Sequence, residues 1–555
     1  MVKICENSRS TLLPMLQKIQ ASKGYVSDKD MQGIADKLGI HPVEVYSVVT
    51  FYSFLNVGKK GKHAVRISNC ASNEMAGSAR IIREFEKVLK IKVGATTKDG
   101  KVSLDRTGCI GMCDMAPAVM VDDILIGEVT PKKVAEIVKR LKSGKKLDDM
   151  ASAGNTEREG PVIFRPIKPY KALGKAIEMG RSSVLDTVRD SNLKGRGGAG
   201  FPVGVKWNLT ATANSKKKFI VCNADEGEPG TFKDKVLLEE YLSLLMEGMT
   251  IAGFAVGADT GVLYLRGEYK YMVRAIEKEL AKLHEAGFLG KNIMGKKGFD
   301  FDIKIRLGSG AYVCGEETAL IESLEGHRGE PRNKPPFPVN TGFEDHPTTV
   351  NNVETFVSAV HIVAEGADWF KKIGTEGSSG SKLISVSGDC AKPGVYEVPF
   401  GISIKEILKI AGAKDVKAVQ VGGAAGCCVP KKDFDRKLSY EDLSTGGSIM
   451  IFGKKRSLLD IAENFLHFFK EESCGQCTPC RQGTVVLSEG VDMLKKGECS
   501  ASYLQDLILL SETMQVASKC GLGQAASTAF ESIIKNFSGE YKTSKRAKKE
   551  TIFNG

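Results

Sequence analysis

The chain has 555 residues, more than one hydrophobic core usually supports, so we expect roughly three or four domains. With 42% hydrophobic and 26% charged residues, and no run near the ~20 apolar residues that span a bilayer, direct membrane insertion is not expected. The net charge of +12 would suit nucleic acid, but the lysines are spread along the chain and no zinc-finger or RNA-binding motif is recognisable. The first residues lack the apolar core of a secretory signal, which predicts a cytoplasmic protein.

The N-terminal part predicts short amphipathic helices followed by a small α/β unit. Apolar residues recur at three- and four-residue spacing in 12–20 and 31–40. From His63 onward the pattern predicts strand, helix, strand, hairpin and closing helix. We assign 1–148 to this unit. The polar stretch 149–160 has no apolar periodicity and is predicted to be a linker.

In the rest of the chain, the sequence patterns predict three further units and a tail. Glycine-rich 161–375 alternates strand-like and helix-like stretches, and 381–452 opens with the strand, turn, strand and helix of a β-grasp domain. Helical periodicity dominates 456–540, which predicts a bundle, while 541–555 has the composition of a frayed basic tail. The predicted fold class is therefore multidomain α/β.

The cysteines favour metal ligation. The chain has 14 of them, and in a reducing cytosol such clustering indicates metal or redox work rather than disulfides. Cys474, Cys477 and Cys480 form a C-x2-C-x2-C run, which suits one face of a cubane iron–sulfur cluster. Cys520 is the best fourth ligand and Cys499 its rival. Zinc would accept four thiolates too, but it favours paired C-x2-C knuckles.

The segment 195–200 is a formal G-x-G-x-x-G. A Rossmann fingerprint needs a strand just before it, whereas 184–193 is predicted to be a helix, so we reject the Rossmann interpretation. Glycines still free the backbone to turn N–H groups toward a phosphate. The candidate phosphate-binding residues are Gly195, Arg196, Gly197, Gly198, Gly200 and Lys206.

Other polar loops follow, each of which taken alone has an ordinary structural explanation. Carboxylates after the strand near 219–224 would bind ribose hydroxyls, a flavin edge or a metal, while acids at a helix start can simply offset its dipole. The candidates in these loops are Asn223, Asp225, Glu226, Glu228, Glu316, Glu317, Lys334, Phe337, Asn351 and Asn352.

Taken in order, GRGGAGFPxGxKW, CNADEGEPGTFKD, SGAYxCGEETAL, KPPFP, NNVET and SCGxCxPCRxGT identify a family. The stretch 161–538 resembles the flavin- and NADH-binding subunit of respiratory complex I, a type shared by NAD-reducing and bifurcating hydrogenases and NAD-dependent formate dehydrogenases. The resemblance implies FMN, NAD(H) and a [4Fe–4S] cluster on Cys474, Cys477, Cys480 and Cys520. Hydride would pass to the flavin, and single electrons would pass on to partner subunits.

The resemblance also implies residue roles. FMN would be held by the glycine loop and by Asn223, Asp225, Glu226, Tyr312, Gly315, Glu316, Asn351 and Asn352. NADH would meet Glu228 as the catalytic residue at the nicotinamide, Phe201 and Phe337 at the adenine, and Glu317 and Lys334 at the ribose. A carboxylate at the ribose favours NADH over NADPH.

Residues 1–145 resemble the thioredoxin-like [2Fe–2S] subunit of complex I with its helical extension. Cys70, Cys109 and Cys113 match three of the four expected ligands, but Met75 stands where the fourth should be. Three interpretations stay open: a [2Fe–2S] cluster with an unusual ligand, loss of the cluster, or a replaced site. The substitute ligands we considered are Ser72, Glu74 and Cys5.

The favoured function is a diaphorase subunit that exchanges electrons between NAD(H) and the iron–sulfur and catalytic subunits of a hydrogenase, formate dehydrogenase or similar complex. One alternative is an electron-bifurcating subunit with ferredoxin as partner. Another is a redox-inactive scaffold, which would be colourless. Cys390, Cys427 and Cys428, in the β-grasp unit, are predicted to be structural.

Overall fold

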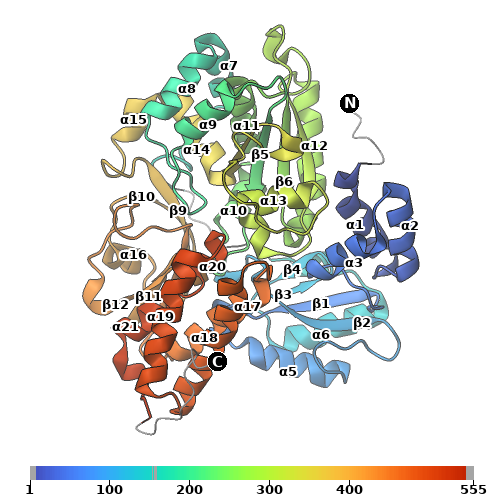
Figure 1. Cartoon of the computed structure of the whole chain (residues 1–555), viewed down its shortest axis with the longest axis vertical. Helices are drawn as coiled ribbons and strands as arrows, with labels where there is room; N and C mark the ends of the chain where they lie inside the picture. The colour runs from blue at the N-terminus through green and yellow to red at the C-terminus, as the bar shows by residue number, and fades with distance from the viewer. Residues whose placement is uncertain (1–7, 153, 155–158, 545–555) are drawn as a thin grey trace.

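The computed structural model describes residues 8–152, 154 and 159–544, which form three sheets and a C-terminal group of helices (Figure 1). None of the described helices is long and apolar enough to cross a membrane. The element order confirms the predicted multidomain α/β class. The limits of the individual domains remain predictions from the sequence.

The N-terminal part begins with three helices, α1 (Leu12–Lys23), α2 (Asp28–Leu38) and α3 (Pro42–Phe51). Local chemistry sets their ends: Ser27 and Asp30 form a capping box at the start of α2. Gly24 and Gly39 adopt the left-handed conformation that ends α1 and α2.

A mixed four-stranded sheet follows, in the order β2-β1-β3-β4, with β1 parallel to β2 and antiparallel to β3. Helices α5 and α6 pack against each other and lie below this sheet in Figure 1. This is the thioredoxin-like arrangement that the sequence predicted. The elements are β1 (His63–Ser68), α4 (Ala71–Met75), α5 (Ser78–Leu89), β2 (Val102–Thr107), η2 (Cys113–Met115), β3 (Val119–Val121), β4 (Ile124–Ile126) and α6 (Pro131–Ser143).

The central unit has a wholly parallel sheet in the order β7-β6-β5-β8. Its first and last strands in the chain, β5 and β8, are neighbours, so connections leave them on opposite sides. In open α/β sheets, ligands bind at the carboxyl ends of the strands at such a switch point. The strands are β5 (Phe219–Ala224), β6 (Thr260–Leu265), β7 (Asp302–Leu307) and β8 (Thr348–Asn352).

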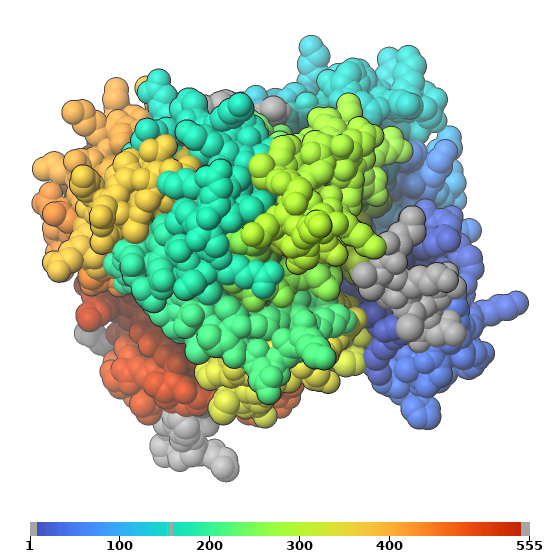
Figure 2. All heavy atoms as spheres, turned by 90° about the horizontal axis from the view of Figure 1, so that it is seen from above, coloured from blue at the N-terminus to red at the C-terminus, as the bar shows by residue number. Residues whose placement is uncertain are grey.

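Helices α11 and α14 pack on this sheet, and α7, α8 and α9 lie over them. Seen from above, these segments make the teal and green centre of the surface in Figure 2, between the N-terminal part in blue and the β-grasp unit in orange. The helices are α7 (Lys171–Met179), α8 (Arg181–Asp190), α9 (Val203–Thr212), α10 (Lys233–Glu240), α11 (Leu242–Val256), η4 (Gly267–Met272), α12 (Val273–Glu285), η6 (Tyr312–Gly315), α13 (Glu317–Leu324), α14 (Val353–Glu365) and α15 (Ala367–Lys371).

The β-grasp unit is a five-stranded mixed sheet in the order β10-β9-β13-β11-β12, with β9 and β13 parallel at its centre. One helix, α16, crosses between its two halves. The elements are β9 (Ser381–Gly388), β10 (Gly394–Pro399), α16 (Ile404–Ile410), β11 (Val416–Val421), η8 (Gly423–Ala425), β12 (Cys427–Pro430) and β13 (Ser448–Gly453).

The C-terminal helices form the predicted bundle, in which α18 packs against both α17 and α19. Helix α21 contacts β12 and so seats the bundle on the β-grasp sheet. The helices are α17 (Leu458–Glu472), α18 (Thr478–Lys496), α19 (Ala501–Ala517), α20 (Gly521–Ala525) and α21 (Thr528–Asn536).

Candidate functional site

The glycine loop lies between α8 and α9, so a helix precedes it, as predicted, and not a strand. The loop is closed by the N–H of Gly195, which donates to the carbonyl of Phe201 at 2.9 Å. Gly200 has a φ of +67°, and a Cβ there would stand 2.5 Å from the Tyr440 ring, so only glycine fits. Within the described residues, the four consecutive N–H groups of residues 197–200 donate to no protein acceptor. Such free amides fit an anion.

Arg196 supports the loop from behind. Its side chain is fully buried and donates to the carbonyls of Ser379 at 2.7 Å and Lys194 at 3.1 Å. Its guanidinium carbon lies 4.8 Å from the centre of the Phe400 ring. The predicted phosphate ligand therefore fastens the loop to the residues in front of β9.

A group of two acids and two lysines lies at the start of α13. Glu317 pairs with Lys206 at 2.9 Å and with Lys334 at 3.4 Å, and Lys334 also pairs with Glu316 at 2.7 Å. Burial alone would raise the pKa of Glu317, but the charge of Lys206, and then of Lys334, lowers it below its ordinary value. Glu317 is therefore an ionised carboxylate, able to accept hydrogen bonds from a sugar hydroxyl.

Two half-exposed phenylalanine rings flank this group. Phe201 is 48% exposed and Phe337 is 49% exposed. The ammonium of Lys206 lies 5.8 Å from the centre of the Phe201 ring, and Phe337 follows Lys334 by three residues. Because both lysines hold Glu317, the two rings belong to one neighbourhood, where flat surfaces suit a heterocycle.

The carboxyl end of β5 is joined to the η6 turn. The side-chain amide of Asn223 donates to the carbonyl of Gly315 at 2.7 Å, and its oxygen accepts the N–H of Asp225 at 3.0 Å. Burial raises the pKa of Asp225 well above its ordinary value, although the charge of Arg266 opposes it. Two segments distant in sequence thus meet at the switch point.

Glu226 is buried and fully hydrogen-bonded. It accepts the N–H groups of Asp234 at 2.7 Å and Lys235 at 3.1 Å, and the hydroxyl of Tyr269 at 3.0 Å. Burial, followed by the nearby charge of Asp234, raises its pKa to about 7. Its carboxylate fixes the loop that leads into α10.

Glu228 lies where the central unit meets the β-grasp unit. It accepts the Tyr312 hydroxyl at 2.6 Å and the N–H of Ala425, in η8, at 3.1 Å. Burial raises the pKa of Glu228 to about 7. The side chain can therefore gain or lose a proton near neutral pH.

The carboxyl end of β8 supplies two amides. Asn351 accepts the indole N–H of Trp207 at 2.8 Å, and Asn352 donates to Asp234 at 2.6 Å. The parallel pairing of β5 and β8 sets Asn351 beside Cys222 and Asn352 beside Asn223. Each side chain has a protein partner that fixes its orientation.

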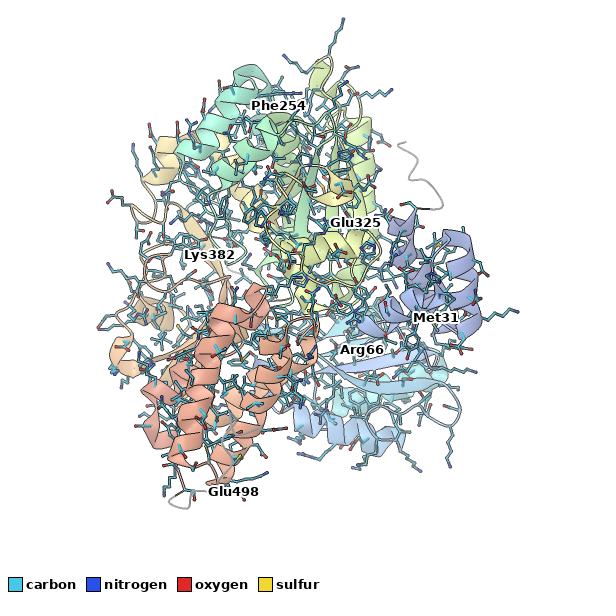
Figure 3. All side chains as sticks on the ribbon, viewed as in Figure 1. Met31, Arg66, Phe254, Glu325, Lys382 and Glu498 are labelled. Carbon is cyan, nitrogen blue, oxygen red and sulfur yellow. The ribbon has the colours of Figure 1, made fainter. Side chains whose placement is uncertain are left out.

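A buried charge network that the sequence analysis missed lies below these amides. Lys233 pairs with Asp234 at 2.6 Å and with Glu354 at 2.8 Å. Lys382, labelled in Figure 3, also pairs with Glu354 from β9. Burial lowers the pKa of Lys382 to about 7. These residues sit inside the KDK and NNVET motifs or on β9, and only the fold brings them together.

The four predicted C-terminal ligands line one small cavity. Cys474, Cys477, Cys480 and Cys520 surround it together with Val313, Pro331 and Leu522. Among the described residues, no three of these four sulfurs lie within 4.8 Å of one another, as ligands of a single ion would. Four thiols around a cavity fit a cubane cluster. Cys499, the rival ligand, is buried but is not part of this lining.

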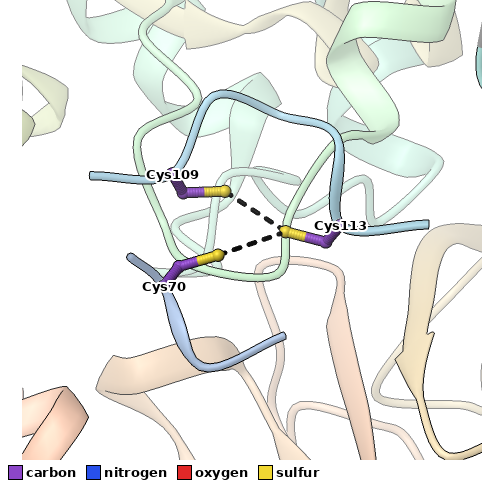
Figure 4. A group of neighbouring side chains, drawn as sticks. All are labelled: Cys70, Cys109 and Cys113. Atoms are coloured by element: carbon purple, nitrogen blue, oxygen red, sulfur yellow. Dashed lines mark hydrogen bonds between the residues drawn. The ribbon is translucent and has the colours of Figure 1, made fainter. Parts of the chain in front are cut away.

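Cys70, Cys109 and Cys113 form a second, tighter group (Figure 4). All three thiols are buried, and Cys113 lies 3.3 Å from Cys109 and 3.8 Å from Cys70, sulfur to sulfur. The amide of Asn73 donates to the Cys70 sulfur at 3.2 Å. The sequence motif therefore does bring its three cysteines together.

Met75 is not part of this thiol group. It packs against a different apolar cluster, and its carbonyl accepts from Arg456 at 3.0 Å. Glu74 is exposed, whereas Ser72 is buried and hydrogen-bonds the Ser387 hydroxyl at 2.9 Å. Cys5 lies outside the described residues. Three thiols of the family's four-ligand pattern are thus in place.

Cys427 and Cys428 point to opposite faces of β12. Cys428 is buried in one apolar cluster and Cys427 packs against another, as neighbouring residues of a strand do. Burial raises the pKa of both thiols. Their divergence agrees with the structural role expected from the sequence.

Comparisons with known proteins identify three family models along the chain. Residues 1–142 match the thioredoxin-like [2Fe-2S] ferredoxin, 188–361 the Nuo51 FMN-binding domain, and 460–544 the NADH-ubiquinone oxidoreductase-F iron-sulfur binding region. Each match covers the residues that carry the corresponding sequence motifs.

Relatives span most of the chain. The NAD-reducing hydrogenase HoxS subunit alpha of Cupriavidus necator is 41% identical over 535 residues, covering 93% of this chain and 89% of that protein. An NADH-quinone oxidoreductase subunit of Rhizobium meliloti is 40% identical over 385 residues, covering 67% of this chain and 91% of that protein.

A solved structure matches as well. The crystal structure of NAD⁺-reducing [NiFe]-hydrogenase in the H2-reduced state contains a chain that superposes with a TM-score of 0.90 at 33% identity, covering 96% of this chain and 93% of that one. The chain therefore belongs to the family of NADH-binding subunits of NAD-reducing hydrogenases and complex I, oxidoreductases that carry electrons through FMN and a [4Fe–4S] cluster.

Proposed function

We propose that FMN lies at the switch point of the central sheet. The glycine loop would hold its phosphate on the free N–H groups, and the ends of β5, η6 and β8 would hold the rest. The proposed FMN residues are Gly195, Arg196, Gly197, Gly198, Gly200, Asn223, Asp225, Glu226, Tyr312, Gly315, Glu316, Asn351 and Asn352. Arg196 would act by fixing the loop, since its two terminal nitrogens donate to the carbonyls of Lys194 and Ser379, while its buried Nε has no partner among the described residues.

NAD(H) would bind beside the flavin at the start of α13. The ionised Glu317, held by Lys206 and Lys334, would accept the ribose hydroxyls, and Phe201 and Phe337 would enclose the adenine. Since a 2′-phosphate would meet the carboxylate, we infer a preference for NADH over NADPH.

The roles of the protein in the reaction are positioning and proton control. Bound FMN supplies the chemistry, because a flavin takes up a hydride and gives electrons singly to a cluster. Glu228, with its pKa near 7 and its bonds to Tyr312 and Ala425, would face the nicotinamide and hold a proton at its carboxyl group. The η8 turn would exclude water on that side.

The observation that carries this proposal is the position of η6. Tyr312 donates to Glu228 at the flavin side, while its neighbour Val313 lines the cavity of the four cysteines. One turn of chain therefore separates the two proposed cofactor sites. We propose Cys474, Cys477, Cys480 and Cys520 as the [4Fe–4S] ligands, and Cys70, Cys109 and Cys113 as three ligands of a [2Fe–2S] centre.

We further infer that the partners are the iron–sulfur and catalytic subunits of a hydrogenase. This inference is supported by the share of the chain that each relative covers. The HoxS alpha subunit matches 93% of the chain, including the N-terminal unit, whereas the quinone oxidoreductase relative matches 67%. The described cysteines are all free thiols, which suits a reducing cytoplasm.

The test is anaerobic analysis of the full chain for FMN, iron and acid-labile sulfide, with EPR after addition of NADH. We expect one FMN per chain and a cluster signal that appears with NADH. If the chain stays colourless and binds neither flavin nor iron after reconstitution, the redox function is refuted and a scaffold role is the remaining hypothesis.

A further inference from the structure

The loop 109–113 carries two of the N-terminal thiols. It packs against the segment 225–228, which follows β5 and belongs to the proposed flavin site; we call this segment the flavin loop. Arg266 joins them: it is 4% exposed and donates to the carbonyl of Cys109 at 2.6 Å and to the carbonyl of Glu226. Glu268 fixes the guanidinium through bonds of 3.0 and 2.7 Å. A single cation thus holds the main chain of both loops.

A second contact runs through Tyr269. Its hydroxyl donates to the carboxylate of Glu226 at 3.0 Å, and Gly111 lies against the same hydroxyl. Gly111 has a φ of +72°, and a Cβ there would collide with the Tyr269 oxygen. The thiol loop can approach the tyrosine this closely only because the residue is glycine.

A third contact runs through Lys235. Its backbone N–H donates to Glu226 at 3.1 Å, and its ammonium reaches the Met112 sulfur at 2.8 Å. Three residues that hold Glu226 therefore also touch the loop 109–113. None of the three is part of the predicted set of flavin or metal residues.

We propose that Arg266 is a positioning residue that transmits the conformation of the loop 109–113 to Glu226, and so sets how tightly the central unit holds FMN. This rests on the proposed flavin site. The N-terminal unit then contributes to flavin binding through its fold, in addition to any cluster that it carries.

The chemistry explains why arginine is required. Its planar fork serves two carbonyls and one carboxylate at once, whereas lysine has three donors on one nitrogen and cannot reproduce that geometry. Losing one hydrogen bond to a charged group costs about 1.5 kcal/mol or more, which is roughly tenfold in a dissociation constant. Arg266→Lys should therefore bind FMN roughly tenfold more weakly.

The chain offers a matched control. Lys270 and Asp123 join the same two units at 2.9 Å, but both side chains are 47% exposed and neither touches Glu226. Lys270→Ala removes a contact between the units without altering the flavin loop. Its FMN dissociation constant should equal that of the wild type, because exposed ion pairs contribute little.

The experiment measures the FMN dissociation constant of the flavin-free full chain by quenching of flavin fluorescence, with the thermal unfolding midpoint of each variant alongside. Arg266→Lys and Tyr269→Phe, which loses one hydroxyl only, should weaken binding while Lys270→Ala does not. The inference is overturned if both variants unfold like the control and bind FMN as the wild type does. A wild type that binds no FMN would instead refute the proposed function itself.

A double-mutant cycle separates transmission from local damage. Gly111→Ala disturbs the thiol loop from the far side of the contact, and Arg266→Gln cuts the link. If Arg266 transmits, Gly111→Ala weakens FMN binding in the wild type and has a clearly smaller effect in Arg266→Gln, since residues in one network are not additive. Equal effects in both backgrounds would show that the disturbance reaches Glu226 through Tyr269, which Gly111 touches, and would refute transmission through Arg266.

Discussion

The backbone N–H of Tyr312 donates a 2.8 Å hydrogen bond to the carboxylate of Glu472. Glu472 ends α17, two residues before the first cysteine of the C-terminal triplet, and burial raises its pKa to about 7. The Tyr312 ring also meets Phe468 edge-on at 4.9 Å. With its hydroxyl on Glu228, Tyr312 links the proposed flavin site to the proposed cluster site.

The C-terminal ligand set can be tested by cysteine replacement. Cys477→Ser should lose about four irons and four sulfides per chain, because its thiol lines the cavity. FMN and NADH-dependent reduction of a flavin-level dye should persist, while electron transfer to the partner subunits fails. Cys499→Ser is the control, and equal iron loss in that variant would contradict our ligand assignment.

If the N-terminal thiols hold a [2Fe–2S] centre, the iron content of the chain should exceed that of the C-terminal cluster alone. With both centres the full chain should hold about six irons, and Cys113→Ser should reduce this to about four. Its buried sulfur is the one that lies nearest to both other thiols. A wild type with about four irons and a single cluster signal would show that three thiols without the fourth cysteine do not assemble the centre.

Glu228 predicts a pH dependence of stability. Its pKa rises from 4.5 to about 7 on folding, so the folded chain keeps a proton that the unfolded chain has released between these values. The stability that this provides is full below pH 4.5 and is lost as the pH rises through about 7. Glu228→Gln keeps a neutral amide, and should be more stable than the wild type at pH 8 by up to about 3 kcal/mol.

Urea unfolding of the flavin-free chain at pH 5 and pH 8 measures this difference. Glu376→Gln replaces an exposed carboxylate and should match the wild type at both values. A Glu228→Gln effect of the same size at both values would argue against a proton on this carboxyl group. Tyr312→Phe removes a bond that favours the carboxylate, so its transition should move to higher pH.

Glu317 predicts the choice of nucleotide. Glu317→Gln removes the charge that would repel a 2′-phosphate, and Lys206 loses its carboxylate partner and becomes available to bind the phosphate, while Lys334 keeps its pair with Glu316. The ratio of kcat/KM for NADPH to that for NADH should rise roughly tenfold, the equivalent of about 1.4 kcal/mol. Arg165→Gln, far along the chain at an exposed pair with Glu365, should leave the ratio unchanged.

The buried network predicts a stability effect. Glu354 compensates both Lys233 and Lys382 in a fully buried setting. Glu354→Ala should destabilise the fold by about 3–5 kcal/mol, because it leaves two buried cations with one acid. Thermal unfolding measures this, with Glu376→Ala on the surface as comparison; a shift no larger than that of the comparison would mean that water reaches the lysines.

Much of the fold and part of the candidate site were predictable because they depend on patterns within short stretches of sequence. Periodicity indicated the N-terminal α/β unit and the C-terminal helices, and cysteine spacing indicated Cys474, Cys477 and Cys480, whereas Cys520 was only the best candidate for the fourth ligand. The buried side of the site was not predictable. Arg196 looked like a phosphate ligand, yet its two terminal nitrogens donate to the carbonyls of Ser379 and Lys194, and no local signal reports the distant contact with Ser379. Lys382 likewise meets Glu354 only through the packing of β9 on the central unit.

The contacts of the N-terminal unit have a consequence for how such chains are assembled. Ser72 bonds Ser387, Asn464 bonds the carbonyl of Asn69, and Arg266 bonds that of Cys109. These bonds reach three different units, so the surface of the N-terminal unit is attached to the rest of the chain at three places in addition to the covalent connection. Fusion into one polypeptide then mainly raises the effective concentration of the N-terminal unit near the rest of the chain, whose surface is complementary to it. We therefore expect the two parts to assemble as separate polypeptides as well, with fusion fixing their ratio at one to one.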